Sequence, residues 1–216
     1  MFHKLLSVAA GAFALAATSA TAATVDVAVT DANGKPAANA VVALAPDVQP
    51  APASHVAARV VIDQQHETFL PLVVVVRKGG EAVFTNNDTT MHQVYSFSPV
   101  KQFQFEIDRG QVSKPVVFDK PGVAAIGCNI HDNMVAYVFV ADAPFAAVTD
   151  AQGRAQIRDV PDGAWHATAW HPQLRVGKQP TPVALTVGGQ QTKLSLTLAL
   201  SGTPMAGMGR MHKSDY

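Results

Sequence analysis

Apolar and polar residues alternate in short stretches along most of the chain, and turn residues separate the stretches. In residues 101–107 (KQFQFEI), phenylalanine and isoleucine fall on one face and glutamine and glutamate on the other. A period of two with one apolar face is the pattern of a strand that covers a core on one side. The period of an amphipathic helix is hard to find after residue 23. The pattern therefore predicts an all-β protein.

The first strands are expected at residues 25–29 and 40–44, paired as a hairpin around the turn sequence DANGKP. Residues 47–57 are rich in proline and alanine, which is typical of a linker. A second group of strands follows, at 59–63, 69–77, 81–86, 101–107, 116–118, 123–127 and 135–140. We therefore expect two groups of strands joined by a linker.

Residues 1–23 have the composition of a signal peptide. A basic start at His3 and Lys4 precedes an apolar run that is too short to span a bilayer, and small residues follow it. Cleavage is expected near Ala22 or Ala23, and the mature chain is expected in the periplasm without stable membrane insertion. That compartment is oxidising.

The charge of the chain excludes some partners. Without Lys4, 15 basic residues stand against 16 acidic ones, so the mature chain has no field that would attract nucleic acid or anionic lipid. We expect no nucleic-acid partner.

Cys128 is the single cysteine of the chain. Structural cysteines in an oxidising compartment come in pairs, and a lone thiol is open to oxidation unless something occupies it. Two explanations are open: a small buried hydrophobic residue at a strand end, or a thiolate that binds a metal.

Potential metal ligands surround this cysteine. In CNIHDNM, residues 128–134, a histidine follows Cys128 by three positions and a methionine follows by six, while His92 comes shortly after the strand expected at 81–86. Two imidazoles, a thiolate and a thioether form the ligand set of a blue-copper centre. Zinc more often has four strong ligands without a thioether. We predict a copper site formed by His92, Cys128, His131 and Met134.

Residues 58–141 resemble the cupredoxin family of blue-copper β-sandwiches. The resemblance rests on VFTNND before His92 and on PGVAAIGCNIHDNM before the last strand, and the loop length is like that of amicyanin. The wider arrangement is similar to bacterial periplasmic cupredoxins of the methylamine-utilisation type. Two positions depart from the family pattern. Gln93 stands where many members have Asn or Asp, and Asp132 stands where amicyanin has proline.

The resemblance implies the role of each ligand. His92, Cys128 and His131 would be equatorial and Met134 axial, and His131 would lie nearest the surface beside an apolar patch. The implied function is outer-sphere electron transfer, with a periplasmic cytochrome or dehydrogenase as partner.

Two other functions remain open on the sequence alone. The same ligands could serve copper tolerance or delivery, or the chain could be a structural β-protein with a vestigial site. An enzyme is not expected, because the sequence has no nucleophile elbow, zinc-protease helix or phosphate-binding loop.

The C-terminal residues 201–216 form a methionine-rich tail that is expected to be flexible. A weak Cu(I) site is possible there, and its ligands would be Met205, Met208, Met211 and His212. The other histidines are weaker candidates: His166 and His171 are expected on opposite faces of a strand, and His55 and His66 in solvent.

A repeated heptad bears on the domain organisation. VTDANGK at 29–35 recurs as VTDAQGR at 148–154. Residues 24–46 and 143–200 together resemble one small sandwich of the carboxypeptidase-regulatory, transthyretin-like kind. We therefore expect a cupredoxin Greek-key β-sandwich, residues 58–142, inserted in this second sandwich. The alternative is a row of separate units whose heptads share only turn chemistry.

Overall fold

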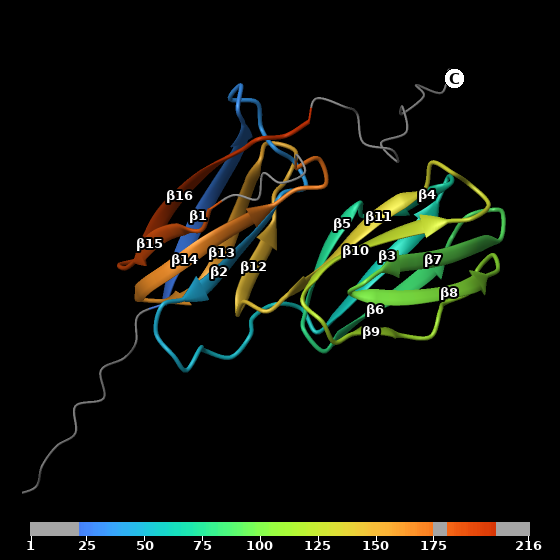
Figure 1. Cartoon of the computed structure of the whole chain (residues 1–216), viewed down its shortest axis with the longest axis horizontal. Coiled ribbons are helices and arrows are strands. Elements are labelled where there is room, and N and C mark those ends of the chain that lie inside the picture. The colour runs from blue at the N-terminus through green and yellow to red at the C-terminus, as the bar shows by residue number, and fades with distance from the viewer. Residues whose placement is uncertain (1–21, 175–180, 202–216) are drawn as a thin grey trace, which may run out of the picture.

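The computed structural model describes residues 22–174 and 181–201, and within these ranges every regular element is a β-strand. The all-β class is therefore confirmed. The strands form four sheets, which pack in pairs as two sandwiches that lie side by side (Figure 1). Residues 1–21 of the expected signal peptide and residues 202–216 of the methionine-rich tail, with its possible Cu(I) site, lie outside the described residues.

The flanking sandwich consists of strands from both ends of the chain. Its strands are β1 (Ala22–Asp31), β2 (Val41–Pro46), β12 (Phe145–Val148), β13 (Arg154–Pro161), β14 (Gly163–Trp170), β15 (Val183–Val187) and β16 (Gln191–Leu198). One sheet has the order β13-β1-β16 and the other the order β12-β2-β14-β15. In β1 the alternation predicts the packing, because Val25, Val27 and Val29 are buried.

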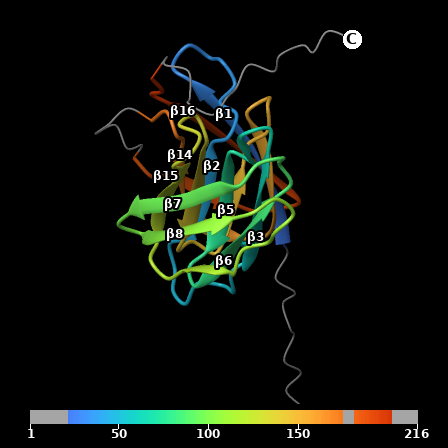
Figure 2. The ribbon, with the colours of Figure 1, turned by 90° about the vertical axis from the view of Figure 1, so that its right-hand side faces the viewer.

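The central sandwich consists of the strands between β2 and β12. These are β3 (Arg59–Gln65), β4 (Thr68–Leu70), β5 (Val73–Arg77), β6 (Gly80–Asn86), β7 (His92–Ser98), β8 (Lys101–Ile107), β9 (Val116–Phe118), β10 (Gly122–Cys128) and β11 (Val135–Ala141). A five-stranded sheet of order β5-β11-β10-β7-β8 packs on a four-stranded sheet of order β4-β3-β6-β9. Figure 2 views the molecule from the side of this sandwich.

The N-terminal strands pair with the C-terminal part of the chain. β1 lies between β13 and β16, antiparallel to the first and parallel to the second, and β2 lies between β12 and β14. This is the pairing expected if a unit is inserted after the second strand. The domain bounds given above stay a prediction.

The hairpin expected between residues 25–29 and 40–44 is wrong, because β1 and β2 belong to different sheets. The turn itself forms: the carboxylate of Asp31 accepts hydrogen bonds from the amides of Asn33 and Lys35. After the turn, Thr30 and Pro36 form only an isolated bridge. Proline has no amide hydrogen with which to continue a ladder, and the chain crosses to the other sheet.

The single strand expected at 69–77 is also wrong. The strand is interrupted at Pro71. β4 pairs with β3 in one sheet, and β5 pairs with β11 in the other. The run of apolar residues hides this break, because it continues on both sides of Pro71. The missing donor of Pro71 again marks the change of sheet.

Each sandwich has its own core. In the central one Phe84 is fully buried, and its ring contacts those of Phe69, Phe103 and Phe105 at centroid distances of 6.5, 5.8 and 5.5 Å. Aromatic pairs at such distances add to the hydrophobic contribution of burial. The core of the central sandwich is therefore formed by side chains from packed strands.

Aromatic contacts join the two sandwiches. Trp170 of β14 packs against Tyr137 and Phe139 of β11, at centroid distances of 5.6 and 6.0 Å. On the connection before β3, the ring of His55 stacks on Phe145 of β12 at 4.6 Å. The two sandwiches thus contact each other through side chains as well as through the connecting chain. Within the described residues, no helix could cross a membrane.

His171 connects two segments of the flanking sandwich. It is 3% exposed, its Nε2 lies 2.9 Å from the carbonyl oxygen of Ala38, and its Nδ1 accepts a hydrogen bond from the amide of Gln173. Both contacts are satisfied only by the neutral ring with its proton on Nε2. Burial lowers the pKa of His171 below its ordinary value, although the bond to Ala38 opposes the shift.

We predict that acid destabilises the fold partly through His171. Because the folded pKa is lower than the unfolded one, the unfolded chain binds the extra proton first, and stability is lost as the pH falls below about 6.5. His171→Gln, which cannot titrate, should give a flatter dependence of urea-unfolding stability on pH between about 7 and 5, followed by tryptophan fluorescence. His66→Asn, at an exposed position in the turn between β3 and β4, is the control. An unchanged slope in His171→Gln would contradict the prediction.

Candidate metal centre

The strand register brings the cysteine close to the first histidine. β10 runs antiparallel to β7, and Cys128, the last residue of β10, is paired with Val94. His92, the first residue of β7, lies two positions before Val94 and therefore on the same face of the sheet. Cys128 is 4% and His92 0% exposed, so both side chains point into the sandwich.

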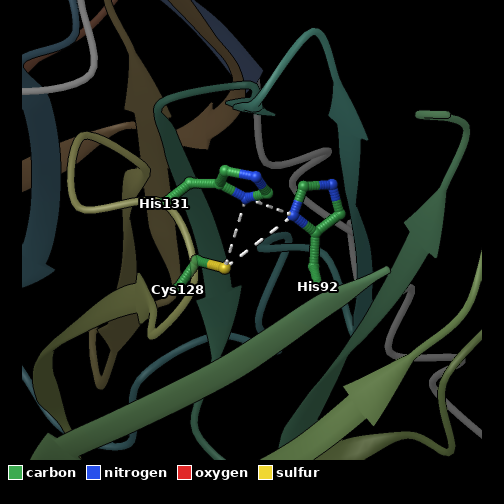
Figure 3. Close-up of side chains that lie close together, drawn as sticks. All are labelled: His92, Cys128 and His131. Carbon is green, nitrogen blue, oxygen red and sulfur yellow. Dashed lines mark hydrogen bonds between the residues drawn. The ribbon is translucent and has the colours of Figure 1, made fainter. Parts of the chain in front are cut away.

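A tight loop adds the second histidine. The amide of Met134 donates to the carbonyl oxygen of His131 at 3.0 Å, which closes a turn between β10 and β11. The turn returns the ring of His131 to a position above Cys128 (Figure 3). Its side chain is 19% exposed and that of His92 is 0% exposed, so of these two candidate ligands His131 lies nearer the surface.

Three possible ligand atoms converge at this end of the sandwich. His131 Nδ1 lies 3.2 Å from His92 Nδ1, and Cys128 Sγ lies 3.8 Å from the nitrogen of His92 and 3.9 Å from that of His131 (Figure 3). Among the described residues, His92, Cys128 and His131 are the group of His, Cys, Asp or Glu side chains that lies close enough together to hold a metal ion. It combines three of the four residues predicted from the sequence.

Asp88 fixes the ring of His92. Its carboxylate accepts hydrogen bonds from the amides of Glu67 at 2.6 Å and Thr89 at 2.8 Å, and Oδ2 lies 3.2 Å from His92 Nε2. Burial alone would raise the pKa of Asp88, but these contacts together lower it. An ionised carboxylate only accepts, so the proton of His92 lies on Nε2 and its Nδ1 presents a lone pair to the cluster.

The charge state of His92 agrees with this arrangement. Burial lowers the pKa of His92, although the contact with Asp88 opposes the shift. The ring is therefore neutral near pH 7, which is the form that binds a metal. A carboxylate behind the second ring nitrogen also makes the imidazole a stronger donor.

Gln93 ties the two ligand segments together. The side-chain amide of Asn129 donates to Gln93 Oε1 at 2.8 Å, and the amide of Asn129 donates to the carbonyl oxygen of Gln93 at 3.0 Å. Gln93 was one of the two departures from the family pattern. In this chain the longer side chain still joins the segment after the first histidine to the loop after the cysteine.

The turn between β3 and β4 lies over the same site. Its central residues His66 and Glu67 both have positive φ, +49° and +54°. Such a conformation costs about 1–2 kcal/mol for a residue other than glycine. The carboxylate of Glu67 approaches His131, with Oε1 3.6 Å from Nε2. The carboxylates of Asp88, behind His92, and of Glu67, behind His131, therefore come from loops whose sequences contain no metal-binding motif.

The donor set fits a metal ion of the soft, trigonal kind. An ion held in a plane by two imidazole nitrogens at about 2.0–2.1 Å and a thiolate at about 2.3 Å would separate the three donors by roughly 3.5–3.8 Å. The observed separations lie between 3.2 and 3.9 Å. The contact between the two Nδ1 atoms can be a hydrogen bond only if one of them carries a proton, and a metal ion would replace that proton.

The remaining predicted ligand, Met134, is 2% exposed and belongs to the same buried cluster of side chains as Cys128. Its assignment as axial ligand stays a prediction, as does the assignment of the other three. His166 lies in β14 and is half exposed, whereas His171 follows the last residue of β14 and is buried. Sequence reasoning missed Asp88, Glu67 and Asn129. The short spacing of Asp88 to His92 was a signal that could have found the first.

The comparisons with known proteins gave matches among solved structures only. No protein-family model and no curated protein sequence matches the chain. Among solved structures, a purple cupredoxin from Nitrosopumilus maritimus is 21% identical, with a TM-score of 0.35 over 38% of this chain and 98% of the other. Amicyanin from Paracoccus versutus is 18% identical, with a TM-score of 0.35 over 45% of this chain and 97% of the other.

A Cu-containing nitrite reductase from Thermus scotoductus also matches, at 21% identity and a TM-score of 0.36, over 39% of this chain and 22% of the reductase. This chain therefore spans about a fifth of the reductase. The two packed sheets of β3 to β11, with a His-Cys-His cluster at the end of β10, make the central sandwich cupredoxin-like.

We predict that Asp88→Asn weakens metal binding. The carboxylate faces three donors, which are the amides of Glu67 and Thr89 and Nε2 of His92. In asparagine an NH₂ group replaces one oxygen, so one of these donors would face another donor. The affinity for Cu(II) should fall by about 10-fold or more, measured by competition with a chelator. Asp142→Asn, which removes a carboxylate paired with the exposed Lys78, is the control. Equal affinities in the two variants would show that Asp88 has no part in the site.

Proposed function

We propose that the chain is a periplasmic type 1 copper protein that carries electrons between redox partners by outer-sphere transfer. The observation that carries this proposal is the buried triangle of Cys128 Sγ and the two Nδ1 atoms, with separations of 3.2–3.9 Å. The copper recorded for the matching proteins supports it, including an amicyanin in a Cu(I) form. When bound, copper supplies a one-electron couple between Cu(I) and Cu(II).

The protein residues around the site favour rapid exchange of an electron. His92 is fixed by Asp88, and the loop that bears Cys128 is fixed to β7 through Asn129 and Gln93. Ligands held in this way before a metal binds need little movement when the charge changes, which is the preorganisation that electron transfer requires. Cys128 would supply the covalent thiolate bond and Met134 the weak axial sulfur.

The surface near the site suits a brief encounter with another protein. His131 reaches the surface, and its neighbour Ile130 is 46% exposed, as is Met91 at 39% beside His92. Apolar side chains around an exposed ligand allow a small interface from which a carrier can leave again. A cytochrome or dehydrogenase is the class of partner that we propose.

A carrier is proposed in preference to an enzyme. The matching reductase is covered only over about a fifth of its length, so it gives no support for the same activity in this chain. Amicyanin, in contrast, is matched over nearly its whole length.

The decisive experiment is a copper titration of the purified mature chain, followed by visible spectroscopy and voltammetry. An intense thiolate-to-copper band with fast, reversible reduction is expected. Tight binding without fast exchange would instead favour copper delivery or tolerance, and no binding would leave a structural β-protein.

We predict that Cys128→Ser abolishes the intense visible band. The thiolate is the source of the band, and Cys128 is one residue of a core formed by many others. Far-ultraviolet circular dichroism of the metal-free variant should stay close to that of the wild type, while the buried hydroxyl should lower the stability by about 1–3 kcal/mol. If the band persisted in Cys128→Ser, another residue would have to be the sulfur ligand.

We predict that Met134→Leu retains copper and colour and raises the reduction potential. Loss of a thioether destabilises Cu(II) more than Cu(I), because it removes a donor from the oxidised ion. Leucine fills nearly the same volume, so the fold should lose less than about 1.5 kcal/mol. Voltammetry of the copper-loaded variant measures the shift. Complete loss of copper affinity would make Met134 a principal ligand and not a weak axial one.

A further inference from the structure

One residue of the turn between β3 and β4, Glu67, contacts both Asp88, which lies behind His92, and His131. The backbone amide of Glu67 donates to Asp88 Oδ2 at 2.6 Å, and the same oxygen lies 3.2 Å from His92 Nε2. The side-chain carboxylate of Glu67 places Oε1 at 3.6 Å from His131 Nε2. Its amide therefore acts behind one histidine and its carboxylate behind the other.

We propose that Glu67 is a positioning residue that orients the ring of His131 toward the metal and tunes the reduction potential. This inference rests on the proposed function, since a potential exists only if copper binds. A negative charge near Nε2 favours the ring form with its proton there, which leaves Nδ1 to face Cys128 and His92. The same charge stabilises the more positive oxidation state of a metal on the far side of the ring.

The two halves of the contact differ in strength. The amide of Glu67 meets a carboxylate that is 8% exposed, and this bond fixes the turn over the site. The carboxylate of Glu67 is 62% exposed and lies beyond hydrogen-bond distance of Nε2, so its effect on His131 is electrostatic and partly screened by water. Substitution of the side chain alone therefore separates the charge from the backbone anchor.

The geometry of the turn supports a role beyond connection. Both central residues have positive φ, a conformation for which Asn-Gly is the preferred sequence. A glutamate in this place has no advantage for the turn itself. Its position places a carboxylate beside the most exposed ligand of the cluster.

The experiment compares Glu67→Ala, Glu67→Gln and a matched control, Glu81→Gln. Glu81 lies on β6 and forms an ion pair with Arg59 at the other end of β3, so the control removes an equal charge from the same sheet. Two quantities are measured in all variants: the reduction potential of the copper-loaded protein, and the mobility of the His131 ring in the metal-free protein by NMR relaxation. Protection of the Glu67 amide from exchange reports whether the turn persists.

The ratio of Cu(II) to Cu(I) affinity should fall about 10-fold in Glu67→Ala, an upward shift of about 59 mV, and by a smaller factor in Glu67→Gln. In the metal-free protein the His131 ring should become more mobile in Glu67→Ala and stay as in the wild type in Glu81→Gln. Potentials and ring mobility that match those of Glu81→Gln would overturn the proposal.

The result separates this inference from the proposed function. If the wild type bound no copper, the proposed function would fail, and the mobility of the His131 ring in the metal-free protein would still decide whether Glu67 orients it. If copper bound with the expected colour but Glu67→Ala changed neither quantity, the proposed function would stand and the role of Glu67 would be rejected.

Discussion

The site depends on three possible ligand atoms that the fold brings together at one point. A nitrogen of His92, a nitrogen of His131 and the sulfur of Cys128 lie within 3.2–3.9 Å of one another, with His92 and Cys128 buried and His131 partly exposed. Buried polar groups without partners are costly, so the surrounding structure must hold them in place. The β7–β10 register, the turn from His131 to Met134 and the carboxylate of Asp88 all act on this one point.

The sequence was informative wherever the evidence was local. Alternation predicted most strands, and the spacing in CNIHDNM together with the upstream His92 predicted the three residues that the fold brings together. The expected hairpin failed because DANGKP describes a turn but not the sheet to which the chain continues. The prediction of one strand at 69–77 was wrong because apolar residues lie on both sides of Pro71, so the apolar pattern gives no sign that β4 and β5 are separate.

Contacts between distant segments were beyond such reasoning. The bond from the Glu67 amide to Asp88 spans 21 positions, and that from Asn129 to Gln93 spans 36. Nothing in the composition of either segment indicates its partner, because the pairing follows from how β3, β6, β7 and β10 lie in the two sheets. The supporting residues of a site are therefore harder to predict than the ligands, whose chemical types restrict the choice.

The arrangement of the strands also has a consequence for the order in which the chain folds. Among the described strands, β1 and β2 have their sheet partners only in β12 to β16, so their two sheets cannot form without the C-terminal part of the chain. The central sandwich consists of the residues in between and can fold first. Once folded, it holds the chain before β3 close to the chain after β11, as the bond from His55 to Pro144 shows. The segments before β3 and after β11 are then already close together, so β2 and β12 pair at a smaller cost in loop-closure entropy. Folding of the central sandwich would therefore speed the assembly of the flanking sandwich.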